Sequence, residues 1–510
     1  MYRPDVLFPV YCSSCWWSDK WDALSYGQDY DFQKPFSDQL RDLLNKVPRN
    51  MLVIRQSVNS DYCNYSNENK NCYLCFASHY NEDCAYLTYC YANRNCFDSL
   101  QLSKSELSYE CNYCDRIARS LFLQYCVECV DCVLGYNLRN CDNCFGCVNL
   151  RNKKYHIFNK PYSKEKYLLL TEQYRSSYQE FWKACQEFQK LKMSMPHPFI
   201  YQKRCVNYSG NDLEDSKNVQ HSFGTKESED CRYLYINCVR VRSSMDLNNI
   251  GYAPSEWCYE GQGISGGNNV FFSDGCWMDG YIMYSHGCFS SSNIFGCVSV
   301  RQKEYCILNK QYSQEEYKAI LTKIIKHMKS TREYGEFLPS ELSPFAYNET
   351  TAQEYFPLTK EQALIRHCTW RDPETKNYQI TLPAGGLPIT VNDISSSLTN
   401  EVIACEHGGS CKDQCTVGFR LTPSEITFYK RMKILVPRLC PNCRHAERRR
   451  QRNPMKLWPR QCMCDYKIYQ NTIKHPHHSE GKCPNEFETS YAPDRPEIVY
   501  CEQCYNAEVV

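Results

Sequence analysis

An internal duplication constrains the fold of this chain more than any other feature. The run FGCVNLRNKKYHIFNKPYSKEKY (145–167) returns 150 residues later as FGCVSVRQKEYCILNKQYSQEEY (295–317). Weaker matches continue upstream in the same order, and Cys84 there aligns with Cys231. Chance similarity does not keep one order and nearly one offset over about a hundred residues. The sequence therefore predicts a tandem pair of similar domains.

A shorter period lies inside the first copy. A polar residue followed by cysteine recurs at Cys72, Cys84 and Cys96, twelve residues apart each time, and then at spacings of 15, 18 and 12. Short fixed periods are typical of solenoids, in which each rung buries its face only against its neighbours. The intervening Tyr, Phe, Val, Leu, Asn and Ser show almost no helical spacing. We expect a β-solenoid whose rung, or half-rung, is twelve residues.

The rung length limits what lies inside the coil. Twelve residues at about 3.3 Å each give a perimeter of about 40 Å, which encloses Cys, Ser, Ala or Val and leaves Tyr and Phe mostly outside. The CxxC pairs of the first copy then allow three interpretations: interior packing, zinc clips or redox chemistry. The second copy carries Val219 opposite Cys72 and Ser222 opposite Cys75, losses that a packed interior tolerates and a zinc site does not. Packing is therefore favoured, and no CxxC pair sits at a helix start within a βαβ unit as a redox pair would.

Each solenoid is followed by a helical segment. Ser163 opens SKEKYLLLTEQYRSSYQEFWKACQEFQKLK, and Ser313 opens a second helix with Glu316 at the capping-box position. We expect these helices to cap the exposed ends of the solenoids, with an aromatic stripe for a partner as the alternative. The following proline-rich region has one short helix with Thr359 at its N-cap.

These features predict a mixed α+β architecture in five parts. The parts are a partial zinc-module remnant with a linker helix (1–50), a first β-solenoid repeat with its capping helix (51–200), a second such repeat (201–336), a linker-like region (337–404) and a zinc-binding module (405–510).

The last part carries the most specific motif. Two cysteine pairs separated by a hairpin and a short helix place four thiolates at tetrahedral distance from Zn²⁺. Their residues are Cys411, Cys415, Cys440 and Cys443, with Cys405 as a possible substitute for Cys411. Four sulfur ligands leave no open coordination position, so the predicted ion is structural rather than catalytic.

A second zinc site is expected further along the chain. Five cysteines compete for its four positions, and three histidines stand in reserve. The candidates are Cys462, Cys464, Cys483, Cys501 and Cys504, followed by His475, His477 and His478. The sequence thus predicts two structural Zn²⁺ ions as cofactors.

The N-terminus echoes this second site. Tyr2 to Cys15 matches Tyr491 to Cys504, which places Cys12 and Cys15 where a zinc knuckle has its cysteines. The chain begins, on this interpretation, inside a further zinc module whose first cysteine pair is missing. Either the gene model is truncated, or the two cysteines recruit ligands from elsewhere.

An arginine-rich stretch follows the first cysteine knuckle. Its arginines lie on one expected helix and its continuation: Arg444, Arg448, Arg449, Arg450 and Arg452. A zinc-braced basic helix suits nucleic-acid phosphates. The alternative is that the guanidiniums pack over tyrosines and pair with carboxylates inside a module poor in apolar core.

Composition excludes several other classes. The 59 basic and 58 acidic residues nearly cancel, so no net field draws the whole chain to nucleic acid or membrane. No apolar stretch is long enough to span a bilayer, and no signal peptide precedes the first cysteines. We expect a cytoplasmic protein with reduced thiols. P-loop, dinucleotide-binding and metalloprotease motifs are lacking, so catalysis is not expected.

Four motifs together resemble one family. They are WWSDKWD (16–22), YGQDYDF (26–32), FGCVNLRNKKY (145–155) and FETSYAPDRPEIVYCEQCY (487–505). The combination resembles uncharacterised cysteine-rich zinc-ribbon proteins of candidate-phylum (Patescibacteria-type) bacteria, and 411–452 is similar to treble-clef-like zinc ribbons. The resemblance implies zinc binding. The family has a complete zinc module before the Trp-Trp motif, whereas here that module is cut short.

The predicted function is that of a zinc-binding structural protein. The solenoid faces would present a Tyr- and Asn-rich surface to a protein partner, with no catalysis, no membrane and no small-molecule substrate. The first alternative is a nucleic-acid or ribosome-associated protein that binds through the Arg-rich segment 444–460. The weaker alternative is a thiol-disulfide oxidoreductase that uses the solenoid CxxC pairs.

Overall fold

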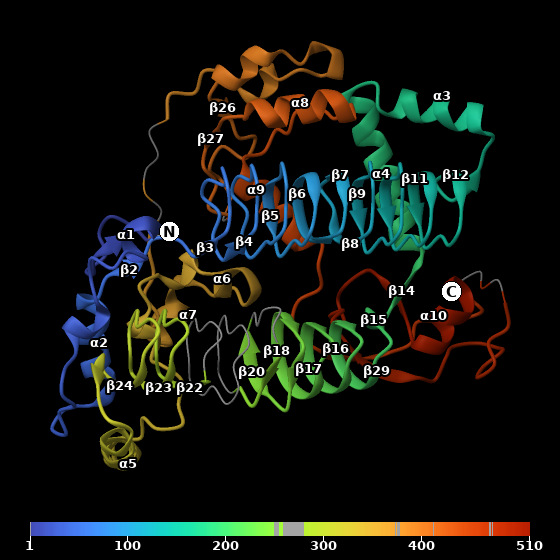
Figure 1. Ribbon diagram of the computed structural model, residues 1–510. Coiled ribbons are helices and arrows are strands. Elements are labelled where there is room, and N and C mark those ends of the chain that lie inside the picture. The colour runs from blue at the N-terminus through green and yellow to red at the C-terminus, as the bar shows by residue number, and fades with distance from the viewer. Residues whose placement is uncertain are drawn as a thin grey trace.

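A computed structural model describes residues 2–248, 254–258, 280–372, 374, 378–411, 413–468, 471 and 473–510. Within these ranges the protein is a mixed α/β structure with ten α-helices and many short strands (Figure 1). Before the first repeat lie β1 (Val10–Tyr11), α1 (Ser13–Trp16), α2 (Phe36–Lys46) and β2 (Arg49–Asn50).

The first repeat winds into a stack of parallel coils (Figure 1). Each paired residue faces the residue twelve positions further on, as Leu121 faces Val133 and Val133 faces Phe145. A full turn of this coil therefore takes twelve residues rather than twice that number. Its strands are β3 (Ile54–Arg55), β4 (Ser66–Asn67), β5 (Ala85–Thr88), β6 (Arg94–Ser103), β7 (Glu106–Tyr109), β8 (Asn112–Asp115), β9 (Leu121–Gln124), β10 (Val133–Tyr136), β11 (Asp142–Val148) and β12 (Lys154–Ile157).

Every third residue of this stack points into the coil. From Cys63 to Cys147 the residues at this spacing are buried. The residue preceding each interior position adopts a left-handed conformation, as Glu128 and Asp131 do at φ 55° and 52°. Each coil therefore has four sides of three residues. Two cysteines three residues apart occupy neighbouring interior positions, which accounts for the many CxxC pairs.

The interior thiols are hydrogen-bonded to the backbone. The sulfur of Cys72 lies 3.4 Å from the carbonyl oxygens of both Lys70 and Asn81. Burial raises the pKa of Cys90 to about 12, so this thiol stays protonated and donates to the carbonyl of Thr88. This geometry favours interior packing over metal clips as the role of these cysteines.

A ladder of buried asparagines also runs through the coil interior, which the sequence analysis did not anticipate. Asn69, Asn81 and Asn93 stack at twelve-residue intervals and are almost fully buried. The Oδ1 of Asn81 accepts hydrogen bonds from the backbone N–H of Asn93 at 3.1 Å and from its Nδ2 at 3.0 Å. The side chain of Asn81 in turn donates to the Oδ1 of Asn69 at 3.2 Å. The ladder satisfies polar groups that the narrow coil hides from water.

Replacing Asn81 by Ala should therefore destabilise the first stack. The variant leaves the Asn93 donors without their acceptor, and we expect the free energy of unfolding to fall by about 3 kcal/mol. Denaturant unfolding measures this fall. Lys70→Ala is the control, since Lys70 is exposed and pairs with Glu82 at 2.7 Å, a surface interaction that contributes at most about 1 kcal/mol. Equal losses in the two variants would contradict the role of the ladder.

The second repeat forms a less regular stack. Its paired residues lie 11 to 14 positions apart, and two register shifts interrupt it. At one shift Gly210 has φ 139°, and a Cβ there would lie 1.7 Å from the carbonyl oxygen of Ser222, so only glycine fits. The strands are β15 (Gln202–Lys203), β16 (Val206–Glu214), β17 (Lys217–Lys226), β18 (Glu229–Val239), β19 (Val241–Arg242), β20 (Met245–Asn248), β21 (Ser255–Glu256), β22 (Gly280–Met283), β23 (Ser292–Phe295) and β24 (Glu304–Ile307).

The two stacks end in the same way, and the residues that form these ends are the ones that match best between the two copies. A hairpin closes each: β12 with β13 (Lys160–Pro161), and β24 with β25 (Lys310–Gln311). In each hairpin turn an asparagine, Asn159 or Asn309, accepts from and donates to the backbone of one valine, Val148 or Val298, at 2.8 to 2.9 Å. These side chains satisfy groups that a further coil would otherwise pair.

Helices follow both hairpins as predicted, with one correction. The second is the single helix α5 (Gln314–Ser330), and its capping box between Ser313 and Glu316 is confirmed. The first is not one helix but two, α3 (Lys164–Tyr174) and α4 (Tyr178–Ser194), because Ser177 caps a new helix in mid-segment. The short strand β14 (Pro196–Pro198) follows α4, and the short helices α6 (Thr351–Tyr355) and α7 (Lys360–Ile365) come after α5.

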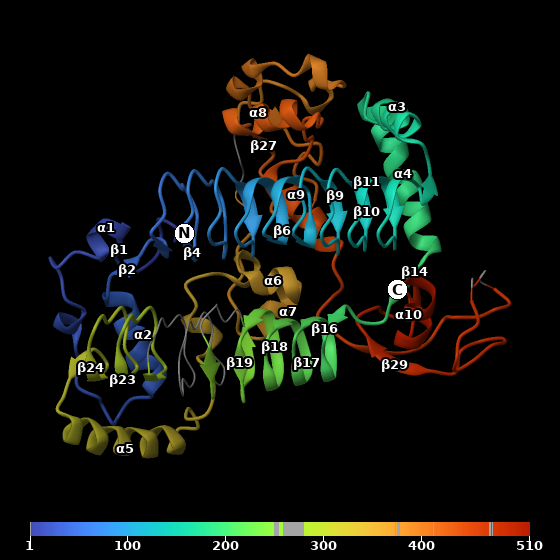
Figure 2. The ribbon, with the colours of Figure 1, turned by 45° about the vertical axis from the view of Figure 1, so that its right-hand side comes forward.

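The C-terminal elements lie against both stacks. The two stacks run side by side with opposite chain directions, and α6 lies between them (Figures 1 and 2). The C-terminal elements are β26 (Ile403–Ala404), β27 (Gly418–Phe419), α8 (Pro423–Met432), α9 (Pro441–Arg450), β28 (Trp458–Gln461), β29 (Glu486–Thr489), β30 (Ile498–Tyr500) and α10 (Glu502–Val509). Within the described ranges no helix has the length and apolar character needed to cross a membrane.

One predicted partner surface is covered by the chain itself. Two outward aromatic residues of the first stack lie under α8, where Phe97 meets Phe428 at a ring distance of 4.5 Å and Tyr109 meets Tyr429 at 5.7 Å. Aromatic side chains do point outward, as expected from the narrow coil. On this face, however, they form a core with the C-terminal elements.

Candidate metal centres

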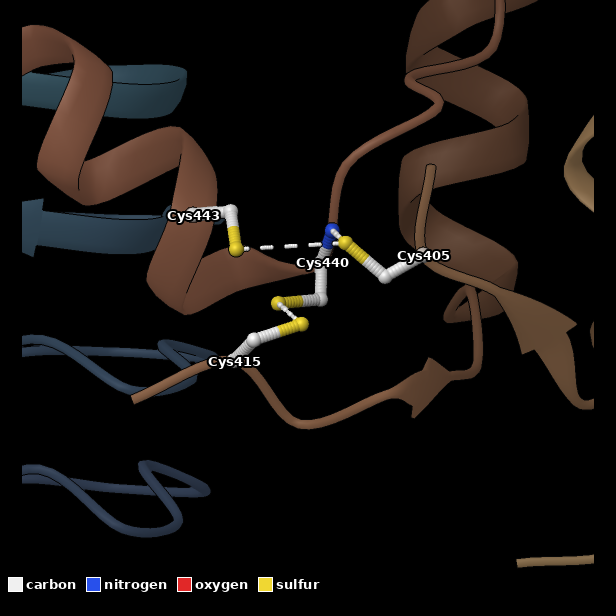
Figure 3. Close-up of side chains that lie close together, drawn as sticks. All are labelled: Cys405, Cys415, Cys440 and Cys443. Atoms are coloured by element: carbon white, nitrogen blue, oxygen red, sulfur yellow. Dashed lines mark hydrogen bonds between the residues drawn. The ribbon is translucent and has the colours of Figure 1, made fainter. Parts of the chain in front are cut away.

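The first centre is a buried group of four cysteines. Cys405 follows β26, Cys415 precedes β27, and Cys440 and Cys443 stand at the N-cap and in the first turn of α9 (Figure 3). The sulfurs of Cys405 and Cys443 lie 3.8 Å apart, and those of Cys415 and Cys440 lie 4.0 Å apart. A tetrahedral zinc ion with four sulfur ligands requires separations of about 3.8 Å.

Local hydrogen bonds favour thiolates at this centre. The backbone N–H of Cys440 donates to the sulfur of Cys405 at 3.2 Å, and that of Val417 donates to Cys415 at 3.3 Å. The hydrogen bond from the Cys405 thiol lowers the pKa of Cys440 to about 3 and raises the pKa of Cys405, so this contact favours the thiolate at Cys440 only. Zinc binds the deprotonated form, so these contacts prepare the cysteines for a metal.

The structure changes one member of the predicted set. Cys405, named only as a substitute, takes the place assigned to Cys411, because the β26–β27 hairpin brings Cys405 beneath the knuckle. Cys411 lies in the loop of this hairpin and forms a smaller group with His407 and Cys443. The short spacing between Cys411 and Cys415 in the sequence was the reason for placing Cys411 in the predicted set.

The second centre repeats the plan of the first. Its buried members follow β28, precede β29, and begin α10: Cys462, Cys483, Cys501 and Cys504. The backbone N–H of Cys501 donates to Cys462 at 3.2 Å, the counterpart of the Cys440–Cys405 contact. Of the five competing cysteines, Cys464 falls outside this group and lies instead beside His475.

Cys12 and Cys15 do not join either centre. Both are exposed, and among the described residues neither belongs to a group that could hold a metal. Helix α1 starts after Cys12 as α10 starts after Cys501, so the knuckle shape is kept. The hairpin that would supply two further ligands has no counterpart beside it in the described ranges.

The exposed Cys12 should be the most reactive thiol. A hydrogen bond from Ser14 lowers the pKa of Cys12 to about 7, so its reactive thiolate forms near neutral pH. We expect its alkylation by iodoacetamide to accelerate as the pH rises from 6 to 8 and then level off, measured by peptide mass spectrometry. Ser14→Ala should shift this midpoint to higher pH. A midpoint unmoved by Ser14→Ala would contradict the assignment.

The arginine-rich segment is largely engaged within the protein. Arg444 and Arg448 are buried and both contact Asp98, at 3.1 and 3.0 Å. Arg449 pairs with Glu354 at 3.6 Å, and the guanidinium of Arg452 lies 3.6 Å from the ring centre of Tyr355. Only Arg450 of these five is exposed. The contacts favour the interpretation that these arginines pack over tyrosines and pair with carboxylates.

Comparisons with known proteins identify no family for this chain. No protein-family model matches it, and no curated protein matches it. Among solved structures, it is similar to a crystal structure described as a "putative acetyltransferase" from Desulfovibrio desulfuricans G20, at 10% identity over 52% of this chain and 69% of that chain. The TM-score of 0.12 is too low for this likeness to carry any argument.

Proposed function

We propose that this chain is a zinc-stabilised structural and interaction protein without catalysis, built from two β-solenoids and two treble-clef-like zinc modules. The pair of buried four-cysteine groups carries this proposal. Each group closes a tetrahedral site with sulfur ligands alone, which suits structural zinc and leaves no position for a substrate. The parallel pairing at twelve-residue intervals supports the solenoid assignment.

The proposed compartment is the cytoplasm. No disulfide joins the described cysteines, although many lie close together in the first stack. Secreted proteins with this many cysteines carry disulfides, whereas reducing compartments keep thiols available for metal. Reduced thiols in the coil interior are therefore consistent with a cytoplasmic protein.

The proposed partner is another protein, bound where the first stack is uncovered. Tyr62, Phe76 and Tyr80 project from the coils that precede the region covered by α8, and each is 42 to 50% exposed. Aromatic residues with exposed rings are typical of protein interfaces. A nucleic-acid partner is less favoured, and RNA binding that falls steeply with salt would be the result that supports it.

Metal content tests the proposal directly. The full chain, purified without added zinc, should contain at least two tightly bound zinc ions, measured by mass spectrometry of the metals. A parallel titration should find the coil thiols free once the protein is denatured. A chain that folds without any metal, or with its thiols oxidised, would overturn the proposal.

A further inference from the structure

Three additional donors lie beside the second cysteine tetrad and adjoin one of its members, Cys504. The sulfur of Cys464 lies 3.5 Å from Nδ1 of His475, and this Nδ1 lies 3.3 Å from Nε2 of His478. The same His478 nitrogen lies 3.3 Å from the sulfur of Cys504. A tetrahedral zinc ion bound at about 2.3 Å by sulfur and about 2.0 Å by nitrogen spaces its ligands about 3.3 to 3.8 Å apart. These separations among the four donors are therefore those expected between the direct ligands of a further tetrahedral ion.

The surroundings of His475 point to a metal ligand. Its side chain is fully buried, and its Nε2 lies 2.9 Å from the carboxylate of Glu508. A carboxylate on one imidazole nitrogen holds the ring and directs the other nitrogen at a metal. Asn471 also donates a hydrogen bond to the sulfur of Cys464 at 3.2 Å, which favours the thiolate. An ion pair with Glu508 alone would not explain why Nδ1 faces two further donors.

This arrangement fits two metal ions better than one ion that could use either of two ligand sets. Cys462 and Cys501 belong to the tetrad but not to the group around His475, and Cys504 is common to both. One tetrahedral ion has four ligands, so it cannot use both sets. A thiolate sulfur has lone pairs for two metal ions. We infer that the C-terminal module binds a second metal ion through Cys464, His475, His478 and a bridging Cys504, an inference that rests on the proposed zinc binding of this module.

The first module carries the same plan in an incomplete form. Cys405-x-His407 corresponds to Cys462-x-Cys464, and Cys411 lies 3.6 Å from Cys443, the counterpart of Cys504. The buried Nδ1 of His407 has no hydrogen-bond partner in the described part of the chain. This group has three donors, one fewer than a closed site requires. The inference is therefore confined to the second module.

Metal counting on the full chain tests the inference. Wild type should hold three zinc ions, and His475→Ala should lose one of them while the tetrad keeps its own. His477→Ala tests the overlapping group of His477, His478, Cys483 and Cys504. The seven other donors complete both proposed sites without His477, so the count should not change. Glu508→Gln should weaken retention of the same ion against a chelator without removing it outright.

A spectroscopic measurement on wild type avoids any dependence on folding of the variants. With Co²⁺ in place of zinc, a bridging thiolate should couple two ions magnetically and reduce the EPR intensity below that of the uncoupled ions. A count of two that His475→Ala leaves unchanged, with no coupling, would overturn the second ion and leave the proposed function standing. A loss of metal in His477→Ala but not in His475→Ala would also overturn it. A chain without any metal would instead overturn the proposed function itself.

Discussion

Replacing Cys440 by Ser is expected to unfold the segment from β26 to α9 while the first stack of coils stays folded. Cys440 is the buried N-cap of α9 and one of four sulfurs at the first centre. A structural zinc ion supplies about 10 kcal/mol of folding free energy to a small module. This is comparable to the whole stability of a typical domain, so we expect the segment to unfold when the ion is lost.

Hydrogen exchange distinguishes local from global loss. Amides of α8 and α9 should lose protection in Cys440→Ser, while those of β9 to β11, held by parallel pairing to both neighbours, should keep theirs. Cys368→Ser is the matched control, because Cys368 is part-exposed and its sulfur donates to the carbonyl of Arg366 at 3.6 Å, away from both centres. A zinc chelator should reproduce the Cys440→Ser pattern on wild type. Full protection of α9 in the variant would show that the fold does not depend on the ion.

Much of the coil could be predicted from the sequence, because the same residue types recur at a fixed spacing. The recurrence at Cys72, Cys84 and Cys96 predicted twelve residues for a rung or a half-rung, and the parallel register shows that twelve residues make a full turn. The wider spacings of 15 and 18 residues looked irregular, yet they are multiples of three, the length of one side. The side length could not be inferred from strand alternation, since left-handed residues at every third position break the period of two.

Contacts between distant segments could not be predicted in the same way. In the sequence, Asp98 resembles the other polar residues of the repeat. The residues around it do not indicate that it contacts two arginines about 350 positions further along the chain. The candidate metal centres were easier to predict, because CxxC knuckles at helix starts are local motifs. The other members of each group come from hairpins, and local spacing favoured Cys411 where the four buried cysteines of the structure include Cys405.

The arginine network makes the last prediction, which concerns how α9 is held on the first stack. Arg448 is 1% exposed and contacts Asp98 at 3.0 Å and Glu110 at 2.8 Å, and Asp98 itself is fully buried. Arg444 adds a second contact to Asp98 and lies over the ring of Tyr86. The network is therefore shielded from solvent and from salt.

Arg448→Ala should lower the free energy of unfolding by about 3 to 5 kcal/mol, since it leaves buried carboxylates without their main partner. Arg450→Ala removes a neighbouring arginine of the same helix that is 52% exposed and pairs with Asp413 and Glu447, and its cost should stay below about 1 kcal/mol. Denaturant unfolding at low and high salt measures both. The loss in Arg448→Ala should hardly change with salt.

A double-mutant cycle separates the ion pair from general packing. If Asp98 and Arg448 act through each other, Asp98→Ala combined with Arg448→Ala should cost less than the sum of the two single variants, because the double variant leaves no unpaired charge between them. Additive losses would show that Arg448 acts through its apolar stem instead. Because the same guanidinium cannot both be buried against Asp98 and contact a phosphate, a measured coupling also removes Arg448 from any nucleic-acid surface.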